Sequence, residues 1–242
     1  MEWYEAVDRV TPHVVRITTP AGSGTGFLVS RTKNSALCGV ATAAHVINHA
    51  HYWEQPIRIQ RANSTESVLL RDSKRVIVLD EQRDTAAILF ERAELGFPEQ
   101  TLPLIEAEMS MKIGNRLGWL GYPGIAGSTL CFFTGTVSAW VQDINGYFVD
   151  GVTINGVSGG PAFVMLGSGV EVIGVVSAYI PNRLTGEVLP GLGVVRDVVQ
   201  FHDVIRQFQS LDEAKSQESP PSPEPPPNPE PTELPNSGRR VT

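Results

Sequence analysis

The sequence of 242 residues carries a formal net charge of −7 and a pI near 5.3, which argues against nucleic acid as the main partner. Hydrophobic residues make up 41% of the chain, enough for one large domain or two small ones with a real core. No apolar run approaches the roughly 18 residues of a membrane span, and the acidic N-terminus does not fit a signal peptide. We therefore expect a soluble, cytoplasmic protein that has no membrane partner.

The predicted elements begin with a short amphipathic helix over residues 2–11, which Pro12 ends. Short runs rich in valine and isoleucine then alternate with glycine-rich turns, as is typical of an all-β chain. Residues 21–26 are interpreted as such a turn rather than a phosphate loop, because no Lys-Ser/Thr and no helix pattern follow. The predicted strands cover residues 13–18, 27–30, 37–47, 57–60, 67–70, 75–79, 85–90, 114–120, 131–141, 147–149, 162–166, 170–178 and 189–195.

The C-terminal region changes character after a predicted amphipathic helix at residues 198–208. Residues 219–235 contain nine prolines among Glu, Ser and Asn, a composition that cannot bury a core and predicts disorder or polyproline II. Residues 220–223 match a PxxP pattern, so a proline-binding partner is one interpretation, beside a solvated tether. We expect the folded unit to end near residue 211.

The two cysteines, Cys38 and Cys131, do not make a disulfide framework. One bridge between them is possible, but two buried reduced thiols are the expected state, in keeping with a reducing compartment.

Residues 156–161 place Ser158 among three glycines and before a proline. Such a loop can expose a hydroxyl while backbone N–H groups point at one spot, which acyl transfer requires. Taken alone, the motif could equally be a surface turn. A catalytic interpretation needs a base and an acid that orients it.

His45 and Asp84 are the candidates for that base and acid. His45 ends a run of small residues, and Asp84 lies where a charged turn enters a buried strand; Asp80 is the competing carboxylate in that turn. His49 and His51 are expected to be exposed on a loop. The pair His45 and His49 lacks the further ligands of a zinc site, so neither a metal nor another cofactor is expected.

With these motifs in hand, the sequence resembles a trypsin-like serine protease of the chymotrypsin fold, and more closely the protease domain of the HtrA/Deg group. The resemblance implies an all-β protein with two six-stranded antiparallel β-barrels and a cleft between them. It places barrel one at about 12–92, barrel two at about 108–196 and a C-terminal helix at about 197–209. These make one protease domain of residues 1–211, followed by a disordered tail of residues 212–242. The matching motifs lie at residues 22–27, 42–46, 84–86, 121–124, 135–138 and 156–161.

The resemblance also implies roles in catalysis. Ser158 would be the nucleophile, His45 the general base and then acid, and Asp84 the orienting carboxylate. The backbone N–H groups of Gly156 and Ser158 would form the oxyanion hole. Where digestive relatives have an aspartate that pairs with a new N-terminus, this chain has Val157, so activation by that cleavage is not expected.

Substrate binding is implied for a second set of residues. Ser177, Ala178 and Tyr179 would form the strand that pairs with extended substrate, and Gly191 would line the far side of the primary pocket. Val152 and Thr153 at its base favour a small or medium apolar side chain. Asp150 would admit a basic side chain only if it points inward.

The leading hypothesis is a serine endopeptidase that acts on proteins or peptides. A catalytically silent peptide-binding module on the same fold is the alternative. An esterase on another scaffold is disfavoured, because α/β-hydrolases order their triad Ser, Asp, His. No PDZ-like segment is recognised, so a peptide-gated HtrA role is not expected, and the sequence does not indicate an oligomeric state.

Overall fold

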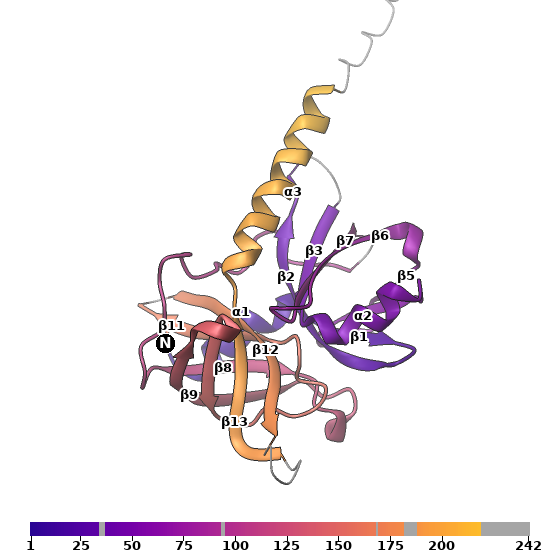
Figure 1. Ribbon diagram of the computed structural model, residues 1–242. Coiled ribbons are helices and arrows are strands. Elements are labelled where there is room, and N and C mark those ends of the chain that lie inside the picture. Colours follow the sequence, from indigo (N-terminus) through magenta and orange to yellow (C-terminus); the bar gives the residue numbers. More distant parts are fainter. Residues whose placement is uncertain (34–36, 93–94, 168, 182–187, 219–242) are drawn as a thin grey trace, which may run out of the picture.

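Strands dominate the protein, whose computed structural model describes residues 1–33, 37–92, 95–167, 169–181 and 188–218 (Figure 1). Of residues 178–181, 188–190 and 215–218, only the backbone is described, and the predicted tail beyond residue 218 lies outside the described residues. The predicted all-β class is confirmed. The strands are β1 (Val14–Thr19), β2 (Gly22–Arg31), β3 (Leu37–Thr42), β4 (Ile57–Arg61), β5 (Ser67–Leu70), β6 (Arg75–Asp80), β7 (Thr85–Glu91), β8 (Arg116–Gly121), β9 (Cys131–Val141), β10 (Gly146–Asp150), β11 (Pro161–Leu166), β12 (Gly169–Pro181) and β13 (Val188–Asp197).

The C-terminal half is a closed barrel in the order β10-β13-β12-β11-β8-β9, as expected for barrel two. The N-terminal half differs in detail from a closed six-stranded barrel. It is a seven-stranded antiparallel sheet in the order β5-β4-β1-β2-β3-β7-β6. Its edges β5 and β6 do not pair in the described part of the chain. The buried guanidinium of Arg75, in β6, donates to the carbonyls of Leu70 (2.9 Å) and Ala50 (3.1 Å).

The core joins the two halves. Strand β2 is buried on both faces, so its consecutive residues enter different clusters. Leu28 belongs to the cluster inside the N-terminal sheet, whereas Phe27 and Val29 belong to a cluster that continues into the barrel through Trp119 and Phe163. One apolar cluster is therefore continuous between the N-terminal sheet and the barrel.

The glycine run expected as a turn at residues 21–26 lies mostly inside β2, which corrects that prediction. The glycines are required by close approach rather than by turning. A Cβ on Gly24 would lie 2.7 Å from the side chain of Val46, and one on Gly26 would lie 2.9 Å from the carbonyl oxygen of Ala41.

The described residues form three α-helices, which flank the strands: α1 (Trp3–Val10), α2 (Ala44–Tyr52) and α3 (Val199–Glu218). Helix α2 corrects the prediction that His49 and His51 lie on a loop, since both lie in its last turn. Helix α3 extends past the predicted end at residue 209, and residues 212–218, which were predicted to begin the disordered tail, are helical instead. The helix leaves the barrel alongside β2 (Figure 1). No helix in the described part of the chain is long and apolar enough to cross a membrane.

Candidate active site

His45 and Asp84 lie close together because His45 follows one strand, Asp84 precedes another, and the two strands are paired. Strands β3 and β7 are antiparallel neighbours, with Thr42 opposite Ala86. His45 comes three residues after Thr42, in the first turn of α2, and Asp84 stands immediately before β7. The Nδ1 atom of His45 lies 3.0 Å from Oδ1 and 2.9 Å from Oδ2 of Asp84, and the backbone N–H of His45 donates to Oδ1 at 3.0 Å.

The environment of Asp84 favours its charged form. Its side chain is 17% exposed, against 48% for that of His45. Burial raises the pKa of the Asp84 carboxyl, but the hydrogen bonds and charge of His45 and a hydrogen bond from the Ser177 hydroxyl outweigh burial and lower that pKa below its usual value. Asp84 also has a positive φ of 49°, which aspartate tolerates better than most residues.

Ser158 faces the same cavity as His45. The cavity holds about 270 Å³ and is lined by His45, Thr153, Ile154, Asn155, Ser158, Val176 and Ser177. The Ser158 hydroxyl donates to the carbonyl oxygen of Ser177 at 3.0 Å. Among the hydrogen bonds of the described residues, none joins the Ser158 hydroxyl to His45.

The loop that carries Ser158 uses glycine where backbone approaches closely. Gly156 and Gly159 have φ of 92° and 88°. A Cβ on Gly156 would lie 2.2 Å from the carbonyl oxygen of Tyr122, and one on Gly159 would lie 1.9 Å from that of Thr25. Only glycine fits either position.

Within this loop, some backbone N–H groups donate a hydrogen bond to the protein and others do not. Those of Val157, Gly159 and Gly160 donate to protein carbonyls at 2.7–3.1 Å. Those of Gly156 and Ser158 have no acceptor in the part of the chain that is described. Two free donors beside a serine hydroxyl can bind a developing oxyanion.

Only some of the residues predicted to bind substrate line this cavity. Thr153 and Ser177 line the cavity, whereas Val152 is 50% exposed and is not part of its lining. The backbones of Ala178 and Tyr179 pair with β13. Their side chains lie outside the described ones.

Gly191 and Asp150 lie together at one end of this region. The carbonyl of Gly191 accepts from the N–H of Gly151 at 2.9 Å, and a Cβ on Gly191 would lie 3.5 Å from Oδ1 of Asp150. The exposed Asp150 does not line the cavity. Gly193 is the glycine against Thr153, since a Cβ there would lie 2.4 Å from its Cγ2 atom.

Sequence reasoning missed part of the site. It assigned Ser177 to a substrate-pairing strand, but the Ser177 hydroxyl also donates to Asp84. Ile154, Asn155 and Val176 also line the cavity. Their position next to Thr153 and Ser177 in the sequence was the available signal.

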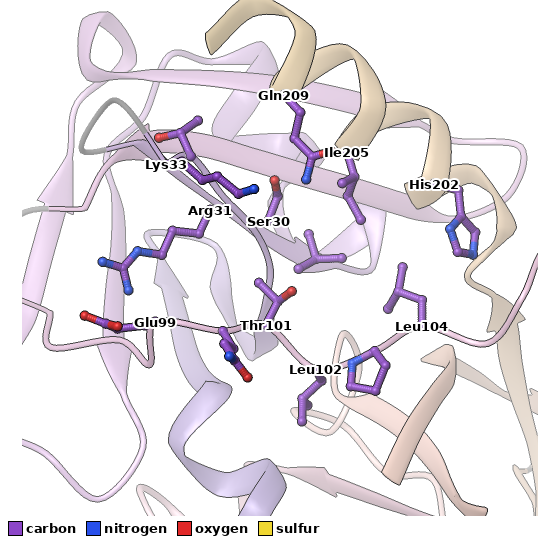
Figure 2. Close-up of a pocket in the computed structure, with 14 residues that line it drawn as sticks. Ser30, Arg31, Lys33, Glu99, Thr101, Leu102, Leu104, His202, Ile205 and Gln209 are labelled. Atoms are coloured by element: carbon purple, nitrogen blue, oxygen red, sulfur yellow. The ribbon is translucent and has the colours of Figure 1, made fainter. Parts of the chain in front are cut away.

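A larger cavity of about 700 Å³ lies away from these residues, where the end of β2, the segment 99–104 and α3 meet (Figure 2). Its lining includes Ser30, Lys33, Thr101, His202 and Gln209, and it contains none of the candidate catalytic side chains. No three His, Cys, Asp or Glu side chains of the described chain are grouped so as to hold a metal ion. Cys38 and Cys131 are both free thiols; Cys38 is buried as expected, whereas Cys131 is only half-buried, which corrects the expectation of two buried thiols.

Comparisons with known proteins agree with this fold. The family described as trypsin-like peptidase domain matches residues 24–175. A serine endoprotease from Yersinia pestis has a TM-score of 0.62 and 21% identity, over 86% of this chain and 68% of that one. An inactive form of the Rv3671c protease from M. tuberculosis has a TM-score of 0.60 and 20% identity, over 84% and 92%. No curated protein sequence matches this chain.

Proposed function

Because this chain belongs to the trypsin-like peptidase family, we propose that it is a serine endopeptidase that cleaves proteins or peptides through an acyl-enzyme. The observation that carries the proposal is that three features lie at one cavity or directly beside residues that line it. These are the hydrogen-bonded pair of His45 and Asp84, the Ser158 hydroxyl, and the two free N–H groups of Gly156 and Ser158.

The reaction begins when the Ser158 hydroxyl turns from the Ser177 carbonyl toward His45. His45 Nε2 takes the hydroxyl proton as Oγ attacks the scissile carbonyl carbon. The carbonyl oxygen becomes an oxyanion and accepts hydrogen bonds from the N–H groups of Gly156 and Ser158. Asp84, ionised at neutral pH, holds the Nδ1–H tautomer of His45 and stabilises the imidazolium.

Collapse of the tetrahedral intermediate breaks the scissile C–N bond. The imidazolium of His45 gives its proton to the leaving amine, and the acyl group stays on Ser158 Oγ. A water molecule then gives a proton to His45 and attacks the acyl carbon. This second addition releases the carboxylic acid and restores the serine hydroxyl.

The cavity supports a preference for a small or medium apolar side chain before the scissile bond. Thr153, Ile154 and Val176 contribute its less polar walls, and the cavity volume is only about 270 Å³. A basic side chain would need Asp150, which lies outside the lining. Cleavage-site profiling on a peptide library tests this preference directly.

The decisive experiment compares the wild type with Ser158→Ala and Ser128→Ala, a serine on an exposed nearby loop. Wild type and Ser128→Ala should react with a fluorophosphonate probe and cleave casein. Ser158→Ala should lose labelling, and its kcat should fall by on the order of 10⁶. A wild type that neither labels nor cleaves would refute the proposal.

The alternative is a catalytically silent module that binds peptides in the same cavity. The observation that favours it is the Ser158 hydroxyl bond to Ser177 rather than to His45. Peptide binding that survives Ser158→Ala, with no turnover by the wild type, would support this alternative. A proline-binding partner for residues 219–235 stays a prediction, because that segment lies outside the described residues.

A further inference from the structure

Every carbonyl group from Asn155 to Ser158 is held by a hydrogen bond. The donor to Asn155 is the N–H of Gly124, at 2.8 Å, and the donor to Val157 is the N–H of Gly160, at 3.0 Å. The other two carbonyls share one partner. Thr25 donates its hydroxyl to Gly156 at 2.8 Å and its backbone N–H to Ser158 at 2.8 Å.

Thr25 thus holds the two residues whose own N–H groups are free. It belongs to β2, in the N-terminal sheet, and lies 131 positions before Gly156 in the sequence. A peptide unit is planar, so fixing the Gly156 carbonyl fixes the plane that carries the Val157 N–H. That plane lies between the two peptide planes that carry the free N–H groups of Gly156 and Ser158. Glycine at positive φ has many competing conformations, and Gly156 therefore depends on such a restraint more than other residues would.

The Thr25 side chain has no freedom to make another bond. The residue is fully buried, and its Oγ1 atom also accepts the N–H of Tyr122 at 3.0 Å. Its carbonyl oxygen accepts the hydroxyl of Thr42 at 2.7 Å. A chain of hydrogen bonds therefore runs from Thr42 through Thr25 to the loop of Ser158 and to the end of β8.

We infer that Thr25 is a positioning residue for the reaction proposed above. Its hydroxyl crosses from the N-terminal sheet and fixes the peptide that follows Gly156, and so keeps the N–H groups on either side of that peptide, those of Gly156 and Ser158, available to an oxyanion. The inference rests on the proposed function, and it assigns catalytic importance to a buried hydroxyl that touches no substrate.

The test compares Thr25→Val, which keeps the side-chain shape and removes the hydroxyl, with Thr25→Ser, which keeps the hydroxyl. Thr42→Val is the matched control, because it removes a buried threonine hydroxyl that bonds the Thr25 carbonyl and donates no hydrogen bond to the loop. Thr25→Val should lower kcat by on the order of 10- to 100-fold, through a small misplacement of the oxyanion donors. Its KM should change less than about threefold.

Thr25→Ser should recover most of the kcat, and Thr42→Val should keep kcat within about threefold of the wild type. The affinity of a peptide boronic acid, which places an anionic oxygen in the oxyanion hole, should fall in parallel with kcat. An equal loss of kcat in Thr25→Val and Thr42→Val would overturn the inference. So would a rise in KM with kcat unchanged.

A second measurement does not depend on catalysis. Amide hydrogen exchange of Val157, Gly159 and Gly160 should be roughly tenfold faster in Thr25→Val than in Thr42→Val or the wild type. Unchanged exchange would overturn the inference even if activity fell. If the wild type hydrolyses nothing, the proposed function fails, and the exchange result alone decides whether Thr25 holds the loop.

Discussion

Asp84 combines three donors on one carboxylate, and this makes it the most constrained side chain of the candidate triad. His45 supplies two of them, its ring N–H and its backbone N–H, and the Ser177 hydroxyl supplies the third. All three stabilise the ionised form, and together they outweigh burial. The negative charge is therefore available at neutral pH to orient His45.

Asp84→Asn tests this role, and asparagine tolerates the positive φ of the site. An amide can present its N–H to His45 and select the wrong tautomer, so kcat should fall by on the order of 10⁴. Steady-state kinetics on a peptide substrate measures the loss. A kcat within tenfold of the wild type would mean that Asp84 does not orient the base.

The same variant should also change how the stability of the fold depends on pH. The folded-state pKa of Asp84 lies below its ordinary value of 3.8, so the carboxylate stabilises the fold above that value. This contribution is lost as pH falls through the lower folded-state pKa. Urea unfolding should therefore show the wild type losing its stability advantage over Asp84→Asn only in acid, below about pH 4.

At the residue scale, sequence motifs could predict His45, Asp84 and Ser158, because each stands in a local pattern that carries chemistry. They could not predict that Thr25 bonds the Ser158 loop or that the Ser177 hydroxyl bonds Asp84. Thr25 is 131 positions from Gly156 in the sequence, and Ser177 is 93 positions from Asp84. The local sequence around Thr25 or Ser177 does not indicate such a distant partner. Such contacts depend on the register of strands in two separate sheets.

Among the elements, the short helical turn η3 (Gly124–Ala126) supports the Ser158 loop from outside. The N–H of Gly124 holds the Asn155 carbonyl, and the same peptide plane carries the free N–H of Gly156. The turn thus holds the peptide plane that carries one of the two proposed oxyanion donors. Ile125, beside Gly124, is 91% exposed, so the turn is not buried by the rest of the fold.

Gly124→Pro removes this donor with little other change, since proline suits the first position of a helical turn and Pro123 is already extended. Losing one hydrogen bond should lower kcat by about tenfold. Gly124→Ala keeps the N–H, and its Cβ would make only an ordinary contact of 3.5 Å with the Asn155 oxygen. Similar kinetics for both variants would remove the turn from the mechanism.

The sequence predicted the type of an element correctly where its hydrophobic pattern was strong. The prediction failed where close approach of backbones, or a change from strand to helix periodicity, determined the structure. β5 (Ser67–Leu70) and β9 (Cys131–Val141) have their predicted bounds. Helix α2 was missed because small and β-branched residues continue the pattern of β3 into it. Its buried Ala44, Ile47 and Ala50, at a spacing of three, were the helical signal.

On the scale of the whole molecule, α3 ties the two halves together. Phe201, near its start, is buried in the cluster shared with the barrel, whereas Phe208 is 6% exposed and lines a groove with Leu70 and Phe90 of the N-terminal sheet. The length of a helix is not fixed by the pattern at its start. Sequence therefore predicted the stripe that contains both phenylalanines, but not the extent of the helix beyond it.

Phe208→Ala should destabilise the whole protein rather than one half. Removing a buried phenylalanine beside an existing groove should cost about 3 kcal/mol of unfolding free energy, near the lower end for such changes. Leu211→Ala, on the same helix but 63% exposed, should cost less than about 0.5 kcal/mol. Because one apolar cluster spans both halves, fluorescence and circular dichroism should report a single transition for both variants. Two separate transitions in Phe208→Ala would mean that α3, not the shared core, is what makes the halves unfold together.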